Sequence, residues 1–253
     1  MRAILLAAGR GLRLQQPEDA QSPKCLLQFG GRTLLERHLR LLRSAGVEDI
    51  VLALGFRHEL VTTELDRLRW QPRPRIVLNA RFELGSVLTV HTVADEMLRG
   101  GEVLLMDADV LYDRRMMIAL TAGHTPVNRL LIDRNYEAGE EPVKLCIRDG
   151  VPVELRKQVP ADLRYDTIGE SVGFFRFDES GARRLANIVA DYAANERGNL
   201  PHEEAVRDLL REGSQVFEVA DVTGVPWIEI DYFADVTRAG SEVLPQLEPL
   251  PGE

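Results

Sequence analysis

Cysteine is scarce in the sequence, and so are long apolar runs and blocks of basic residues. The two cysteines, Cys25 and Cys146, lie far apart and not in a metal-ligand spacing. A disulfide is therefore not expected, and we predict a reduced, intracellular protein. The first apolar run, residues 3–8, ends at Gly9 and is too short for the core of a signal peptide or for a membrane span. We expect a cytoplasmic protein without a membrane partner.

The 253 residues carry a formal net charge of −9 without a basic block. Proteins that bind nucleic acid usually present a basic face, so nucleic acid is not expected as a partner. An anionic substrate would then have to meet a local basic site. Lysine is rare among the candidates for such a site, because only Lys24, Lys144 and Lys157 occur against many arginines.

The order of predicted elements indicates an α/β protein. Apolar strands alternate with helices in the first half, which favours parallel strands joined by right-handed crossovers. The expected strands are 3–8, 50–54, 75–78, 102–106, 129–133, 144–148, 172–177, 216–219 and 227–230, and the expected helices are 33–46, 59–68, 86–98, 179–196, 202–211 and 232–239. No linker divides the chain, so we predict one domain over residues 1–243 with a mostly parallel mixed sheet. Residues 244–253 are expected to form a loose, proline-rich tail.

A glycine-rich turn follows the first predicted strand and carries arginines. Gly9 and Gly11 allow a positive φ and a close approach of backbone N–H groups to phosphates. Arg10 and Arg13 can meet phosphate oxygens, and Lys24, about a dozen residues on, can reach a transferring phosphoryl group. This combination predicts a nucleotide-handling enzyme, although the turn lacks both the Walker and the full Rossmann patterns. The alternative is a tight strand-to-helix turn with solvated arginines.

Acidic residues follow two other predicted strands. Asp107 and Asp109 come directly after the strand that ends at residue 106, and Asp231 follows the strand 227–230. Carboxylates at such positions suit Mg²⁺, which binds oxygen ligands and bridges to phosphates. The alternative is helix capping, by Asp109 or Asp113 at the first step and by Asp231 or Asp235 at the second.

Several further side chains are weaker candidates on their own. Lys144, Arg156 and Lys157 could neutralise a second anionic substrate, but surface lysine is usually solvated. Glu170 and Ser171 start a strand and could line a pocket or form a turn. An aromatic patch could hold an organic cation, although most of its members are expected in the core; they are Tyr165, Phe174, Phe175, Trp227, Tyr232 and Phe233.

Taken together, these motifs resemble the nucleotidylyltransferase superfamily, and most of all its phosphocholine cytidylyltransferase-like branch. The resemblance covers nearly the whole chain in order. It rests on Leu6–Arg13, Pro23–Leu27, Thr33–Arg37, Ala45–Ile50, Leu105–Asp109, Lys157, Gly169–Gly173 and Trp227–Asp231. It implies a Rossmann-like, GT-A-related three-layer α/β sandwich. The stretch 15–21 lacks the Pro-Leu-Thr pattern common in sugar-activating members, which argues against hexose 1-phosphates.

The resemblance also implies roles for individual residues. Arg13 and Lys24 would hold the triphosphate and act in catalysis, and Lys157 would act near the acceptor phosphate. Asp109 and Asp231 would hold Mg²⁺. The remaining nucleotide contacts would be Leu6, Ala7, Ala8, Gly9, Gly11 and Asp107, and the acceptor would also meet Glu170, Ser171 and Trp227.

The function we predict is a Mg²⁺-dependent cytidylyltransferase. A small phosphorylated alcohol or a phosphonate, such as phosphocholine, would attack the α-phosphorus of a nucleoside triphosphate and release pyrophosphate. The alternatives are a sugar-1-phosphate nucleotidylyltransferase and a GT-A-type glycosyltransferase that uses Asp107–Asp109 as its metal motif. A third is a non-catalytic nucleotide-sensing domain, against which the presence of Lys24, Asp109 and Asp231 argues. The glycosyltransferase would not need the basic turn. The base, the acceptor and the oligomeric state, including a homodimer, are left open by the sequence.

Overall fold

The computed structural model describes residues 1–14, 22–123, 126–137 and 139–252. The stretch 15–21, used above to argue against hexose 1-phosphates, lies outside these residues. The strands are β1 (Arg2–Ala7), β2 (Gln28–Phe29), β3 (Arg32–Thr33), β4 (Asp49–Leu54), β5 (Arg75–Leu78), β6 (Val103–Asp107), β7 (Val110–Tyr112), β8 (Asn128–Asp133), β9 (Lys144–Arg148), β10 (Val151–Arg156), β11 (Thr167–Phe177), β12 (Phe217–Asp221) and β13 (Trp227–Glu229). The helices are α1 (Leu34–Ser44), α2 (His58–Leu68), α3 (Ser86–Thr92), α4 (Ala94–Met97), α5 (Arg114–Thr121), α6 (Glu179–Ala194), α7 (His202–Arg211) and α8 (Phe233–Arg238).

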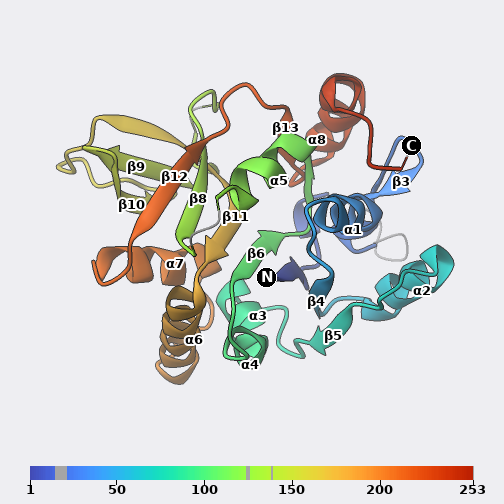
Figure 1. Cartoon of the computed structure of the whole chain (residues 1–253), viewed down its shortest axis with the longest axis horizontal. Coiled ribbons are helices and arrows are strands. Elements are labelled where there is room, and N and C mark those ends of the chain that lie inside the picture. Colours follow the sequence, from blue (N-terminus) through green and yellow to red (C-terminus); the bar gives the residue numbers. More distant parts are fainter. Residues whose placement is uncertain (15–21, 124–125, 138, 253) are drawn as a thin grey trace.

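A mixed central sheet organises the molecule, as predicted. Its strand order is β10-β9-β11-β6-β1-β4-β5, with β8 also on β11 and β12 on β8. The neighbours β6, β1, β4 and β5 run parallel, whereas β11 is antiparallel to β6, β8 and β9. The sheet therefore joins a parallel half to a mixed half at β11, since β9 and β10 are antiparallel whereas β12 runs parallel to β8 (Figure 1).

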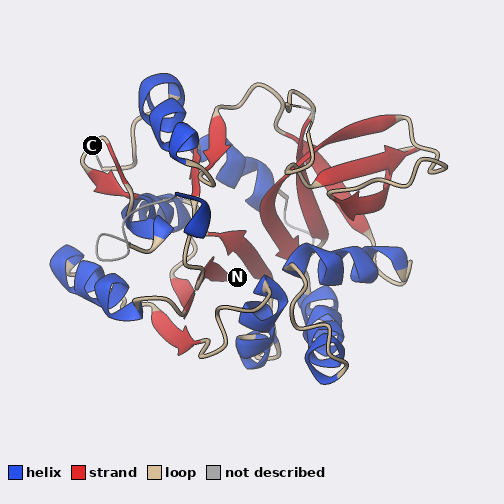
Figure 2. Cartoon of the chain, turned by 180° about the vertical axis from the view of Figure 1, so that it is seen from behind, coloured by secondary structure: helices blue, strands red, loops and turns tan. Residues whose placement is uncertain are grey.

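Helices cover both faces of this sheet, which gives the predicted three layers. In β1, Ile4 and Leu6 face one core, which is completed by α3, α4, α6 and α7, because successive strand residues point to opposite faces. Ala3 and Leu5 face the second core, completed by α1, α2 and α5. Figure 1 shows the first group of helices along the lower side of the sheet, and Figure 2 shows the same layers from behind. Among the described residues, no helix is long and apolar enough to cross a membrane.

Several local predictions are corrected. The helix expected over 86–98 breaks at Val93 into α3 and α4, within a segment rich in β-branched residues, which fit a helix poorly. The short elements β7 and α5 were not predicted. Asp113 caps α5, since its carboxylate accepts a hydrogen bond from the Arg115 N–H at 2.9 Å.

The segment expected to be a loose tail is described up to residue 252. It carries a short 3₁₀ helix over Leu244–Gln246. Further on, the Glu248 N–H donates to Asp113 Oδ2 at 2.8 Å, and Leu250 is buried in the second core, which α1, α2 and α5 complete. The segment ends beside the β2–β3 hairpin (Figure 1).

Candidate active site

The glycine turn and the first acidic motif meet because β1 and β6 are parallel neighbours. Leu6 of β1 pairs with Asp107 of β6, so both strands end at the same edge of the sheet. Gly11 has φ +64°, and a Cβ there would lie 3.0 Å from Lys24 Cγ. Glycine at this position therefore allows the Lys24 side chain to lie against the turn. A cavity of about 530 Å³ opens here, lined among others by Leu6, Ala7, Gly9, Gly11, Arg13, Lys24 and Asp109.

Lys24 bridges the two predicted metal ligands. Its Nζ lies 2.8 Å from Asp109 Oδ2 and 2.8 Å from Asp231 Oδ1. Burial alone would lower the pKa of Lys24, but the two carboxylates outweigh it and raise that pKa above its ordinary value. The ammonium group therefore stays charged at neutral pH and offsets the repulsion between the aspartates.

The second aspartate reaches this edge through the short strands β7 and β13. Val110 pairs with Glu229 in this antiparallel pair, and the Ile230 N–H donates to the Asp109 carbonyl at 3.0 Å. Asp109, Glu229 and Asp231 each place a ligand atom within 4.8 Å of the others. Three carboxylates form the hard oxygen donor set that Mg²⁺ prefers, so these residues fit the predicted metal. The Asp235 carboxylate, not that of Asp231, caps α8.

A second basic group faces the same cleft. Arg13 Nη1 lies 3.1 Å from Asp231 Oδ2 and 2.9 Å from Glu141 Oε2. Lys157 Nζ donates to that same Glu141 oxygen at 2.8 Å, and the Tyr232 hydroxyl donates to the other at 3.2 Å. The Lys157 ammonium is the largest cause that lowers the pKa of Glu141, to about 2. Three hydrogen-bond donors thus converge on one anionic group.

An acidic and aromatic cavity of about 410 Å³ adjoins Asp231. It is lined by residues that include Asp133, Glu170, Trp227, Tyr232 and Asp231 itself. The Trp227 indole N–H donates to Asp133 Oδ2 at 2.8 Å, which fixes both side chains. Burial, followed by the neighbouring charge of Asp133, raises the pKa of Glu170 to about 7.

Not every predicted site residue lies in these cavities. Ala8 is buried, and its carbonyl accepts a hydrogen bond from the Phe56 N–H at 3.0 Å. Ser171 is also buried, within β11. Lys144 donates to the backbone carbonyls of Gly139, Pro142 and Lys157, so it holds the segment that carries Glu141. Arg156 pairs with Glu204.

Two acidic residues of the site were not assigned from the sequence. Glu229 lies two residues before Asp231, the strand spacing that puts two side chains on one face, and this signal could have found it. Glu141 lies in a loop without a recognisable motif, so its position between Arg13 and Lys157 could only come from the fold.

The fold and the family match together define a nucleotidyltransferase. The chain belongs to the family of the MobA-like NTP transferase domain, which matches residues 3–163. This confirms the predicted superfamily and sets the domain among NTP transferases, not among the glycosyltransferases considered above.

Two curated relatives show how far the similarity extends. The chain is 26% identical over 266 residues to the CMP-5'-(3-aminopropyl)phosphonate synthase of Streptomyces rubellomurinus, an alignment that covers 98% of this chain but 40% of that protein. It is 22% identical over 259 residues to the CTP:phosphoglutamine cytidylyltransferase of Campylobacter jejuni, with 93% and 98% covered. The chain therefore spans less than half of the first relative and nearly all of the second.

A solved structure agrees with the fold. The inositol-1-phosphate CTP transferase from T. maritima superposes with a TM-score of 0.77 at 19% sequence identity, covering 97% of this chain and 95% of that one. At this identity the likeness supports the architecture described above.

Proposed function

We propose that the chain is a Mg²⁺-dependent cytidylyltransferase that joins CTP to a small phosphate or phosphonate with a cationic head. The observation that carries the proposal is the Lys24 ammonium group, 2.8 Å from both Asp109 and Asp231 at the edge of the glycine turn. A triphosphate bound here would meet backbone N–H groups, two cationic side chains and a carboxylate set for a metal ion. Relatives named as cytidylyltransferases support CTP as the nucleotide.

The residues of the nucleotide cleft position the triphosphate and balance its charge. Gly9 and Gly11 let the backbone approach the phosphates. Lys24 and Arg13 neutralise negative charge that grows at the α-phosphate and on the departing pyrophosphate. Asp109 and Asp231 would hold Mg²⁺ with Glu229 beside them, and the bound ion would supply Lewis-acid polarisation of the phosphoryl group.

The acceptor phosphate is assigned to the point where Arg13, Lys157 and the Tyr232 hydroxyl converge. The Glu141 carboxylate lies at this point and accepts hydrogen bonds from all three groups, which supports an anion-binding role for them. A phosphate oxygen is already ionised at neutral pH, so the reaction needs positioning and no general base. In the transfer, an acceptor oxygen forms the new bond to the α-phosphorus while the bond to the pyrophosphate oxygen breaks.

The cavity around Glu170 and Trp227 is the reason for proposing a positively charged head group on the acceptor. Carboxylates and aromatic faces together attract organic cations. Asp133, Glu170 and Trp227 line this cavity, and so do Glu141 and Tyr232 from the proposed phosphate position. A quaternary or primary ammonium head would therefore be preferred over a neutral sugar ring.

A pyrophosphate-release screen tests the whole proposal. It crosses four nucleoside triphosphates with phosphocholine, 2-aminoethylphosphonate and several sugar 1-phosphates, each with and without Mg²⁺. We expect the largest rate with CTP and a cationic acceptor. A largest rate with a sugar 1-phosphate would establish the alternative acceptor class, and no release with any pair would refute the enzyme assignment.

The raised pKa of Glu170 predicts how acceptor binding depends on pH. Below about 7 the carboxyl group is neutral, and above it the ionised form attracts a cation. We therefore expect KM for phosphocholine to fall as pH rises through about 7, and Glu170→Gln to raise KM and flatten this change. The acceptor's own phosphate also titrates near pH 6, so the comparison between wild type and variant isolates Glu170. Glu48→Gln, at an exposed carboxylate outside this cavity, is the control and should keep the wild-type profile. Parallel profiles for wild type and Glu170→Gln would contradict the assignment.

The close approach of Gly173 to Asp107 predicts that a side chain at position 173 would move the Asp107 carboxylate. It has φ +76°, and a Cβ there would lie 2.3 Å from Asp107 Oδ2. Gly173→Ala should therefore displace this carboxylate and lower kcat, besides the strain of about 1–3 kcal/mol expected for a side chain at positive φ. Gly150→Ala is the matched control, since Gly150 has φ +78° and nothing within 4 Å of a Cβ. Both variants should lose thermal stability through strain at positive φ, Gly173→Ala at least as much as Gly150→Ala, and the loss of kcat should be confined to Gly173→Ala. Equal kcat in both would contradict the contact.

A further inference from the structure

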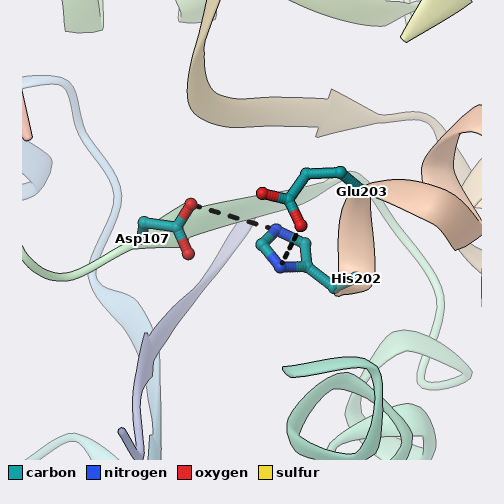
Figure 3. A group of neighbouring side chains, drawn as sticks. All are labelled: Asp107, His202 and Glu203. Atoms are coloured by element: carbon teal, nitrogen blue, oxygen red, sulfur yellow. Dashed lines mark ion pairs between the residues drawn. The ribbon is translucent and has the colours of Figure 1, made fainter. Parts of the chain in front are cut away.

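A second cluster of ligand side chains lies beside the nucleotide cleft, outside the Asp109–Glu229–Asp231 group. Asp107 ends β6, whereas His202 and Glu203 begin α7 (Figure 3). One potential ligand atom of each residue lies within 4.8 Å of the other two. The fold thus brings together an imidazole and two carboxylates from distant parts of the chain.

His202 is held rigidly and is aimed at Asp107. Its side chain is buried, its backbone N–H donates to Ser86 Oγ at 2.9 Å, and its Nδ1 lies 3.1 Å from the same hydroxyl. The ring also packs edge-on against Phe175. These contacts leave Nε2 facing Asp107 Oδ2 at 3.9 Å, too far for a hydrogen bond (Figure 3).

Two buried polar atoms of this cluster lack a hydrogen-bond partner within the described part of the chain. They are His202 Nε2 and Glu203 Oε2. The latter lies 3.2 Å from His202 Nδ1 but without hydrogen-bond geometry. Leaving buried polar atoms unpaired is costly, so such atoms call for an explanation. A cation that accepts lone pairs from both residues would satisfy them together.

We propose that Asp107, His202 and Glu203 form a second divalent metal site that takes a transition ion such as Mn²⁺ or Co²⁺. An imidazole nitrogen with two carboxylate oxygens suits these borderline ions, whereas Mg²⁺ prefers oxygen ligands alone. The site thereby differs in preference from the all-carboxylate group around Asp231. The contact between His202 Nδ1 and the Ser86 hydroxyl supplies the outer partner that orients a ligating histidine.

The position of the cluster suggests what the ion would do, a step that rests on the proposed function. Asp107 adjoins the nucleotide cleft, and Glu203 lines a cavity shared with Lys157. An ion held between them would lie between the two substrates, where paired metal ions stabilise attacking and leaving oxygens. Metal binding itself requires no turnover, so it can be tested without the reaction.

Titration with Co²⁺ alone tests the site, using visible absorption for ligand type and calorimetry for stoichiometry. We expect two bound ions in the wild type. Asp231→Asn should remove one ion and keep the absorption of imidazole-bound Co²⁺, whereas His202→Gln should remove that absorption. Glu203→Gln should weaken the same ion at least about tenfold, as ligand-shell changes typically do. Glu204→Gln, its neighbour on α7, is the matched control and should bind Co²⁺ like the wild type.

Each result decides the matter. Circular dichroism and thermal unfolding check that the variants fold, and Glu203→Gln keeps the buried histidine in place if His202→Gln does not fold. Unchanged Co²⁺ binding in Glu203→Gln, together with loss of all binding in Asp231→Asn, would overturn the second site and leave the proposed magnesium ligands intact. The wild type could instead bind Co²⁺ through an imidazole and yet release no pyrophosphate with any substrate pair. That result would support the second metal site and refute the enzyme assignment.

Discussion

Lys24→Ala is expected to lower kcat for nucleotidyl transfer about 10²–10³-fold, the loss typical when one preorganised donor to developing charge is removed. Lys24 is the cationic side chain shared by Asp109 and Asp231, and it lies against the glycine turn. Its ammonium group would meet the phosphate oxygens where charge grows during transfer. The measurement is steady-state pyrophosphate release with saturating CTP and acceptor, so that kcat and KM are separated.

The same variant makes a second measurement informative. Without Mg²⁺, loss of the ammonium group leaves Asp109 and Asp231 facing each other without their shared partner, so the melting temperature should fall. Mg²⁺ should restore it and stabilise the variant more than the wild type. Arg183→Ala, which removes a cation from the exposed face of α6, is the control for net charge and should change neither quantity. Wild-type kcat in a folded Lys24→Ala would exclude the proposed role.

The part of the site that could be predicted from sequence lies at the ends of long, buried parallel strands. The run 3–8 and the run 102–106 are apolar throughout, as expected for strands covered on both faces. Parallel strands of this kind place their carboxyl ends together, so Gly9 and Asp109 could be expected at one edge. The pairing of Leu6 with Asp107 bears out that expectation in the structure.

The part that could not be predicted depends on short or irregular segments. Asp231 follows β13, which was predicted as the strand 227–230, but it reaches Asp109 because β13 pairs with β7, a strand of three residues whose pattern is too brief to recognise. Glu141 reaches Arg13 from a loop, and His202 reaches Asp107 because α7 packs against α3. Each contact is set by tertiary packing between segments far apart in the chain, and local propensity carries no information about it.

Lys24 and Glu141 belong to one connected network of ion pairs in the cleft. Lys24 is held by two carboxylates, and Glu141 is held by Arg13 and Lys157. Asp231 links the two groups, because it contacts both Lys24 and Arg13. Substrate phosphates and a divalent cation would therefore exchange with ion pairs already in place, so the side chains need little reorganisation to meet them. Preorganisation of this kind is the main source of electrostatic catalysis.

Asp109→Asn is expected to raise the Mg²⁺ concentration for half-maximal activity at least about tenfold, since even the loss of an outer partner of a metal costs that much. Asparagine keeps the size of the side chain but removes one of the charges that Asp109, Glu229 and Asp231 direct at a common point. It also weakens the hold on Lys24, so kcat at saturating Mg²⁺ should fall as well. The measurement is pyrophosphate release as a function of Mg²⁺ concentration at fixed CTP. Asp95→Asn, on the exposed side of α4, is the matched control and should follow the wild-type curve. If the curve for Asp109→Asn superimposes on that of the wild type, Asp109 is not a metal ligand. The pairing of β7 with β13 would then have no role in binding Mg²⁺.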